Sequence, residues 1–334
     1  MKNKKYTNDI WMHNAILMHR DLDKKIPIHV EIEVTKNCNH RCAFCFSNGG
    51  LKGTVNYNNK NMSFPYDRLI TLIDELKDIG VKAISLTGVG DPLVYPHIFE
   101  LLDYIASKDI EIGITTNLCF RLTDEQIKTL NRCSWIRTSI NATDEKTYKL
   151  VHNPKDDQGL QTVINNIKRL DTIISVSYVV WKDNKDFIYD AVVLAKSLGV
   201  NSINFRPFLN YKRSGYDYDD KIKELLYKAK KLETNDFIVD IGRNRVHDMK
   251  EVAKDIPCKI CHYQCFIDAD GRVFPCCMME NNSSIAYGNI MKDSFINVWS
   301  MRKELNMKKC PPCRHTKDNI YLNLLEEERI NNFI

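Results

Sequence analysis

Short runs of β-branched residues alternate with amphipathic stretches over much of the chain, and this alternation limits the possible folds more than any other feature. Helical patterns such as 66–80 and 190–200 have a glycine at or near their end, where helices commonly stop. The strands between the helices are expected at 28–35, 82–88, 110–117, 135–141, 173–180 and 201–207. Six β/α repeats predict parallel strands joined by crossover helices, an α/β fold of the partial (β/α)6 TIM-type barrel class.

The expected strands have one apolar and one polar face. The apolar set is Val30, Ile32, Val34, Ile84, Leu86, Ile112, Ile114, Ile136, Ile140, Ile203 and Phe205. The opposite faces carry Glu31, Glu33, Ser85, Thr87, Glu111, Thr115, Asn117, Arg137, Ser139, Asn141, Ser175, Ser177, Asn204 and Arg206. The outer face of a barrel meets helices, so the polar face is expected to line a wet lumen sized for a bound molecule. Half-exposed strands of a one-sided sheet are the alternative.

The remainder of the chain divides by composition. A charge-rich, helical pattern follows the barrel, and cysteines gather towards the C-terminus. We expect an N-terminal helical lead at 1–25, the barrel at 26–210, a helical connector at 211–257, a small cysteine-rich α+β domain at 258–318 and a C-terminal helix at 319–334.

The cysteine content points to metal or redox chemistry. The chain has 12 cysteines, and nothing at its start resembles a signal peptide or a membrane span. We therefore expect a cytoplasmic protein, in which clustered thiols bind metal or react instead of forming a disulfide framework. The net charge of +5 is spread along the chain and favours an anionic substrate only weakly.

Three cysteines follow the first expected strand at the spacing CxxxCxxC, namely Cys38, Cys42 and Cys45. Structural zinc needs four protein ligands, and His40 is the only local candidate for a fourth. A cubane iron–sulfur cluster bound by three thiolates keeps one iron open for another ligand. This pattern resembles the signature of the radical S-adenosylmethionine enzymes. The resemblance implies that S-adenosylmethionine binds the open iron and is cleaved to a 5′-deoxyadenosyl radical, with Phe44 near the adenine and a flavodoxin or ferredoxin as external electron donor.

Further segments extend this resemblance along the barrel. "LTGVGDP", at 86–92, is similar to the family's glycine-rich turn that receives the cofactor's amino group, although Asp91 replaces the usual glutamate. "TTN" and "SIN" end the third and fourth strands, at the edge where barrel active sites assemble. The cofactor-binding residues implied by the resemblance are Thr87, Gly88, Val89, Gly90, Asp91, Thr115, Asn117, Ser139 and Asn141. Residues such as Ser139 and Asn141 also often just satisfy backbone groups.

The second group of cysteines resembles the SPASM/twitch extension of the same family. The implied ligands of one auxiliary [4Fe-4S] cluster are Cys258, Cys276, Cys310 and Cys313. Cys261 also fits the first position, and a four-cysteine zinc ribbon fits the spacing as well. Cys258, Cys261 and Cys276 approximate the arrangement in nucleotide-cyclising enzymes of molybdenum-cofactor synthesis, but the chain lacks their C-terminal double glycine. Cys265 and Cys277 are expected to be buried small hydrophobes.

The predicted reaction is the oxidation of an alcohol of sugar or cyclitol type, with the auxiliary cluster as electron acceptor. Few residues precede Cys38, which favours a small polar metabolite over a leader peptide. Arg206, with Asn204, is a candidate substrate anchor or a structural ion-pair partner, while Glu31, Glu33 or His97 would take the proton. An epimerase would need a thiol donor, for which Cys119 is the candidate. The alternatives are an epimerase, a peptide-modifying or nucleotide-cyclising enzyme, or a zinc-stabilised nucleic-acid binder.

Overall fold

The computed structural model describes residues 26–45, 62–208, 218–241, 256–280 and 282–307, together with residues 315, 319, 320, 322 and 323. Within them one ten-stranded sheet runs in the order β10-β9-β8-β1-β2-β3-β4-β5-β6-β7. The expected lead at 1–25 lies outside the described residues, as does most of the expected C-terminal helix. No helix in the described part of the chain is long and apolar enough to span a bilayer.

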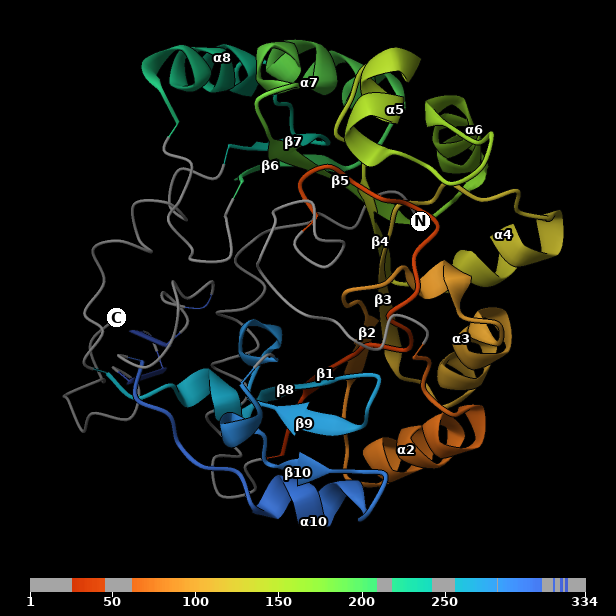
Figure 1. Ribbon diagram of the computed structural model, residues 1–334, viewed down its shortest axis with the longest axis vertical. Helices are drawn as coiled ribbons and strands as arrows, with labels where there is room; N and C mark the ends of the chain where they lie inside the picture. The colour runs from red at the N-terminus through yellow and green to blue at the C-terminus, as the bar shows by residue number, and fades with distance from the viewer. Residues whose placement is uncertain are drawn as a thin grey trace.

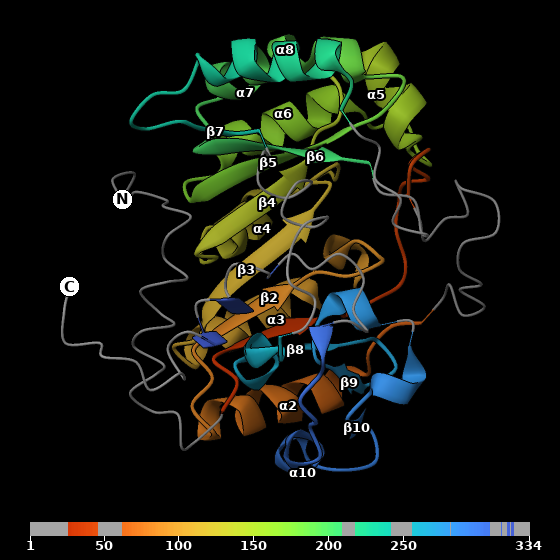
Figure 2. The same cartoon turned by 90° about the vertical axis from the view of Figure 1, so that its left-hand side faces the viewer.

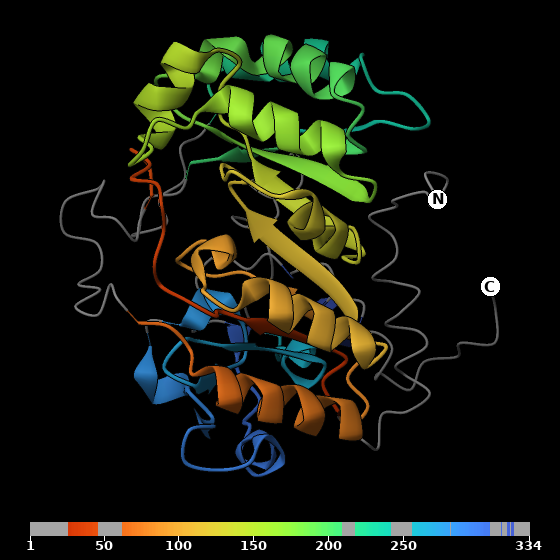
Figure 3. The ribbon, with the colours of Figure 1, turned by 90° about the vertical axis from the view of Figure 1, so that its right-hand side faces the viewer.

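The predicted partial barrel is confirmed. Strands β1 (His29–Ile32), β2 (Ala83–Leu86), β3 (Glu111–Thr116), β4 (Trp135–Ser139), β5 (Ile173–Val180) and β6 (Ser202–Pro207) pair in parallel, each with the next. Helices α2 (Tyr66–Asp78), α3 (Ile98–Ser107), α4 (Asp124–Leu130), α5 (Glu145–His152), α6 (Leu160–Arg169) and α7 (Ile188–Ser197) connect them. Figure 1 shows these helices along the outer side of the curved sheet, and Figure 3 shows them in front of it.

Two parts of the sheet go beyond the six expected repeats. The expected helical connector contains α8 (Asp220–Lys230) but also a short strand, β7 (Ile238–Asp240), which pairs in parallel with β6. On the other side, β8 (Gln264–Ile267) pairs in parallel with β1 and continues through β9 (Arg272–Phe274) and β10 (Gly288–Asn289), followed by α10 (Phe295–Ser300). The cysteine-rich segment is therefore an extension of the barrel sheet.

The hydrophobic core lies between the outer face of the sheet and the helices. Apolar strand residues such as Val30, Ile32 and Ile114 are fully buried, as are Leu69 and Leu72 of α2. Burial of each such side chain contributes about 1.5–3 kcal/mol. Local signals set the helix boundaries, since Thr123 and Gln126 form a capping box at α4 and Asp144 caps α5.

The inner face is polar, as expected, and much of it is buried. Figure 2 views the strands from the side opposite their helices. Near the start of the strands the polar groups satisfy one another, because Asn204 Nδ2 donates to Ser175 Oγ at 2.7 Å and His29 Nε2 lies 2.8 Å from Ser85 Oγ. Glu111 was expected on this face but is exposed, since it begins β3 at the rim of the sheet.

Candidate active site

The segment 35–45, which carries the CxxxCxxC motif, leaves β1 and docks on the C-terminal end of α5. Arg41 N donates to the carbonyl of His152 at 3.2 Å, and Ala43 N donates to the carbonyl of Val151 at 2.8 Å. The last carbonyl groups of a helix accept no hydrogen bond within the helix. These contacts therefore satisfy carbonyl groups of the helix end and N–H groups of the loop. The loop conformation is therefore set by α5 as well as by β1.

The three motif thiols influence one another electrostatically. Burial raises the pKa of Cys38 to about 11, with a further contribution from the negative charge of Asp91. Burial raises the pKa of Cys42 well above its ordinary value, and the neighbouring Cys45 and Cys38 add to the effect. Thiolates gathered in this way need a bound cationic centre to be stable, which is the chemistry of a metal cluster.

The glycine-rich turn after β2 packs directly on the start of the cysteine loop. A Cβ on Gly90 would lie 2.3 Å from the carbonyl oxygen of Thr35 and 2.4 Å from that of Asn37. A Cβ on Gly88 would lie 2.6 Å from Cγ of Glu33. Glycine is required at both positions because backbone and side-chain atoms approach so closely. The turn and the cysteine loop thus form one unit.

Asp91 holds this turn against the end of β3. Its buried carboxylate accepts hydrogen bonds from Leu93 N at 3.0 Å, Asn117 N at 2.6 Å and Thr116 Oγ1 at 2.8 Å. Burial raises its pKa to about 6, against the lowering effect of these donors. Within the protein the Asp91 carboxylate thus binds two backbone N–H groups and the Thr116 hydroxyl, and its role in cofactor binding stays a prediction.

Asn117 and Asn141 are likewise engaged within the protein. Asn117 Nδ2 donates to Asn39 Oδ1 at 2.7 Å and lies 4.0 Å from Cys38 Sγ. Asn141 Oδ1 accepts from Val179 N at 2.5 Å, and its Nδ2 lies 3.2 Å from His152 Nε2. These contacts support the interpretation of Asn141 as a group that satisfies its surroundings.

The other predicted cofactor residues lie at the same edge of the sheet. Thr87, Val89, Thr115 and Ser139 are partly exposed there. The Phe44 ring meets that of His152 edge-on, with centroids 6.4 Å apart. These side chains therefore remain accessible to a molecule lying over the strand ends.

The first auxiliary cysteines lie at the opposite end of the lumen. Cys258 and Cys261 precede β8, which starts beside the beginning of β1, and both are buried. Cys261 Sγ donates to the carbonyl of Cys258 at 2.8 Å, and the adjacent thiols raise the pKa of Cys258 and lower that of Cys261. Cys276 follows β9, which runs back antiparallel to β8. The remaining predicted ligands, Cys310 and Cys313, lie outside the described residues.

The two spare cysteines differ in their surroundings. Cys265 is buried in the core on β8, where burial raises the pKa of its thiol. Cys277 is only partly buried. The core position of Cys265 fits the expected role of a small hydrophobe.

Comparison with protein families explains both groups of cysteines. A model of the radical SAM superfamily matches residues 32–195, and a model of the SPASM iron–sulfur cluster-binding domain matches residues 258–319. The chain belongs to the radical SAM superfamily.

Known proteins similar to this radical SAM chain have diverse activities. It is 23% identical to the subtilosin biosynthesis protein AlbA of Bacillus subtilis, over 82% of this chain and 60% of AlbA. It is 29% identical to a GTP 3′,8-cyclase of Syntrophomonas wolfei, over 54% of this chain and 55% of the cyclase. The crystal structure of Streptococcus suis SuiB bound to precursor peptide SuiA has a TM-score of 0.64 at 17% identity, covering 88% of this chain and 70% of SuiB. The chain therefore spans less than two thirds of AlbA and of the cyclase.

Membership of the radical SAM superfamily implies a [4Fe-4S] cluster, S-adenosylmethionine and an auxiliary cluster. The donor set fits this, because Cys38, Cys42 and Cys45 supply three mutually interacting thiols, and the residues just before Cys38 pack on the glycine-rich turn. The predicted cofactors are confirmed at this level.

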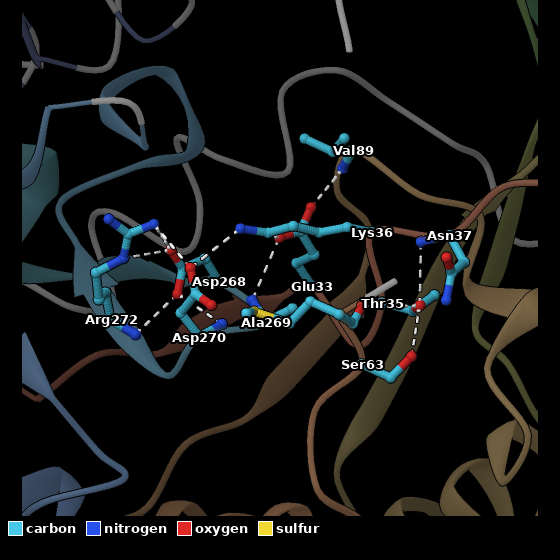
Figure 4. A network of polar contacts seen from close by, with 11 residues as sticks. Glu33, Thr35, Lys36, Asn37, Ser63, Val89, Asp268, Ala269, Asp270 and Arg272 are labelled. Carbon is cyan, nitrogen blue, oxygen red and sulfur yellow. Dashed lines mark hydrogen bonds and ion pairs between the residues drawn. The ribbon is translucent and has the colours of Figure 1, made fainter. Parts of the chain in front are cut away.

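Glu33 joins the glycine-rich turn to the hairpin of the SPASM region (Figure 4). Its two carboxylate oxygens accept from Val89 N at 2.6 Å and from Ala269 N at 3.2 Å. Lys36 lies 4.0 Å from Glu33 and 3.2 Å from Asp270 of the same hairpin. Burial raises the pKa of Glu33 to about 7, although these donors lower it. Glu33 was a candidate base, but here it connects two parts of the protein.

Further acidic side chains lie near the junction that Glu33 forms between the glycine-rich turn and the SPASM hairpin. Arg272 donates to Asp268 at 2.8 Å and to Asp270 at 3.1 Å. Glu280, 6% exposed, has its pKa raised to about 8 by burial and by the charge of Glu33. Glu31 lies deeper on the same face of β1 and is also buried. One wall of the lumen therefore has acidic character.

The predicted substrate anchor lies across the lumen on β6. Arg206 and Asp240 both act on the phenol of Tyr218, whose pKa is raised first by burial, then by Asp240, and lowered by Arg206. This places Arg206 near β7, and Asn204 is bonded to Ser175. Asp240 lies opposite Asn204 in the β6–β7 pairing, and both it and Arg206 act on the phenol of Tyr218.

Two further candidates lie away from the lumen. Cys119 is fully buried in the core between sheet and helices, and its Sγ lies 3.5 Å from the carbonyl of Gly159. His97 is exposed and packs on Tyr66 of α2, with ring centroids 4.8 Å apart, so it belongs to the outer helical layer. These positions do not support a hydrogen-donating thiol or a lumen base.

Sequence reasoning missed a group of buried rings below the cysteine loop. His152 stacks on Tyr148 at 4.4 Å, and His40 lies edge-on to both rings. Burial lowers the pKa of His152 to about 3 and that of His40 to about 4, so both are neutral near pH 7. The sequence offers one hint of these buried rings: Asn153, a residue type that tolerates the left-handed conformation it adopts after α5, places His152 at a helix end.

Proposed function

We propose that this radical SAM protein oxidises a small polar substrate in its lumen, converting an alcohol of sugar or cyclitol type to a carbonyl. When bound, S-adenosylmethionine and the cluster supply a 5′-deoxyadenosyl radical that removes a hydrogen atom. The substrate would then lose one electron to the auxiliary cluster and one proton to the protein, so that atoms and charge balance.

The placement of the two cysteine groups carries this proposal. Cys38, Cys42 and Cys45 follow the end of β1, whereas Cys258 and Cys261 precede the parallel strand β8 that begins beside the start of β1. The four paired residues of β1 span about 10 Å at about 3.3 Å per residue. A substrate in the lumen would therefore lie between hydrogen abstraction at one end and electron transfer at the other.

The walls of the lumen suit a polar molecule. Glu31 on β1 is the best placed proton acceptor, because Glu33 already accepts two backbone N–H groups and His97 lies among the outer helices. Arg137 faces the lumen from β4 beside Trp135, at 5.4 Å from the ring centroid. Hydroxyl and anionic groups of a substrate can be bound by such arginines.

The proposal is tested in deuterium oxide with candidate polyols, dithionite and S-adenosylmethionine under anaerobic conditions. We expect one carbonyl product for each 5′-deoxyadenosine formed, with no solvent deuterium at the attacked carbon. Replacement Glu31→Gln should slow product formation more than uncoupled cofactor cleavage. Solvent deuterium at that carbon would instead establish epimerisation.

Modification of a peptide is the second candidate. It is supported by the similarity to AlbA and to SkfB, a sporulation killing factor maturation protein, each over more than four fifths of this chain. Fractionated cell extract separates the two candidates. A small substrate predicts that the low-molecular-weight fraction stimulates 5′-deoxyadenosine formation even after protease treatment, whereas a peptide substrate predicts that protease abolishes the stimulation.

A further inference from the structure

We propose that His152 donates a hydrogen bond to the sulfur of Cys42 and thereby raises the reduction potential of the cluster that binds S-adenosylmethionine. His152 Nδ1 lies 3.5 Å from Cys42 Sγ. This distance is within the range for a hydrogen bond to sulfur, and α5 supplies both the histidine and the carbonyls that hold the cysteine loop. The inference rests on the three-cysteine cluster and not on the identity of the substrate.

The direction of the hydrogen bond follows from the other ring nitrogen. His152 Nε2 lies 3.2 Å from Asn141 N, a backbone amide that can only donate. Nε2 must therefore accept, and the ring proton is on Nδ1, which faces Cys42. A second Asn141 atom, Nδ2, lies at the same distance from Nε2 and can also donate to it.

The ring is fixed in this orientation by its surroundings. His152 is 1% exposed and stacks on Tyr148, and its backbone carbonyl accepts from Arg41 N in the cysteine loop. A rotation that removed Nδ1 from Cys42 would leave the buried Asn141 N–H without this acceptor, at a cost of about 1–3 kcal/mol. The fold therefore fixes the contact between His152 Nδ1 and Cys42 Sγ.

A donor at a ligating sulfur stabilises the reduced cluster more than the oxidised one. Reduction adds negative charge that is shared by the thiolates, and hydrogen bonds to the sulfurs are among the factors that set cluster potentials. Loss of the donor should make reduction by the external electron donor less favourable. His152 is thus a positioning residue that acts through Cys42.

The test is a redox titration of the reconstituted protein followed by electron paramagnetic resonance. His152→Phe keeps the ring but removes both nitrogens, and should lower the equilibrium constant for reduction of this cluster about tenfold, equivalent to 59 mV for one electron. His152→Gln offers an N–H donor and an oxygen acceptor and should restore part of the loss. Tyr148→Phe keeps the ring stack and should leave the potential unchanged. The auxiliary cluster serves as an internal control in every variant.

Two outcomes would overturn the proposal. One is an unchanged potential in His152→Phe with the cluster in place. The other is an equal shift in the potentials of both clusters in His152→Phe, or the same shift in Tyr148→Phe. Either result would show a general effect on packing. Should His152→Phe fail to hold its cluster, His152→Gln decides. A reduction constant below the parent's by less than about tenfold supports partial donation by its amide, whereas a value equal to the parent's or a loss of about tenfold or more contradicts the proposal.

Discussion

Replacing Gly90 by alanine tests the contact between the glycine-rich turn and the cysteine loop. The added Cβ would lie 2.3 Å from the Thr35 carbonyl oxygen and 2.4 Å from the Asn37 carbonyl oxygen, whereas ordinary contacts begin at 3.4 Å. Both obstacles are backbone atoms, so the turn and the loop must separate by about 1 Å. This strain should cost about 1–3 kcal/mol of stability, because overpacking in a tight site is relieved only by backbone shifts.

The same displacement should have a larger effect on chemistry. A misplacement of about 1 Å between reacting groups can reduce a rate by about 10²-fold. We expect Gly90→Ala to retain its iron but to release 5′-deoxyadenosine about 10²-fold more slowly than the parent protein. Gly80→Ala is the matched control, since a Cβ there meets nothing within 4 Å although the backbone is left-handed. It should lose stability but not cofactor cleavage. A parent-like rate in Gly90→Ala would refute the reasoning.

The remaining predictions concern the junction and the core. Glu33→Gln leaves a single side-chain oxygen for two backbone donors, Val89 N and Ala269 N, so the turn and the hairpin can no longer both be held and S-adenosylmethionine should bind more weakly in equilibrium dialysis. Glu75→Gln, which loosens a contact between α2 and α10, should bind it normally. Burial raises the pKa of Glu280 from 4.5 to about 8, so the folded state keeps this proton to higher pH than the unfolded state and parent stability should fall between these pH values in urea titrations. Glu280→Gln should show a smaller fall than the parent, because Glu33 and Asp91 still titrate in the same range. Cys119→Ala should lower stability by about 1 kcal/mol and leave turnover intact, and abolished turnover in a folded variant would contradict the core placement.

The barrel strands could be predicted from the sequence because alternation and turn signals are local. β5 agrees with the expected 173–180, and β1 to β4 and β6 lie within their predicted ranges. The seventh strand, β7, was missed because its three residues, Ile238–Asp240, are too few to show a period within a charge-rich region. Pairing of β8 with β1 joins segments far apart in the chain, and no local pattern specifies such a pairing.

The candidate site was predictable as a set of positions but not as a set of roles. The cysteine spacing predicted a cluster loop and "GVGD" predicted a turn at the cofactor site, and the structure packs this turn on the start of that loop. Whether a polar side chain faces a ligand or the protein depends on partners that only the fold supplies, as Asp91, Glu33 and Asn141 demonstrate. His152 could not have been predicted for the same reason, since its partner Cys42 is distant in sequence.

The central claim is that Cys38, Cys42 and Cys45 hold the cluster at which S-adenosylmethionine is cleaved. The most direct measurement is 5′-deoxyadenosine release by anaerobically reconstituted, dithionite-reduced Cys42→Ala beside the parent protein, with the iron of each determined. The account predicts release by the parent, none by the variant, and retention of the auxiliary cluster's iron in both. Release by Cys42→Ala at the parent rate would contradict it.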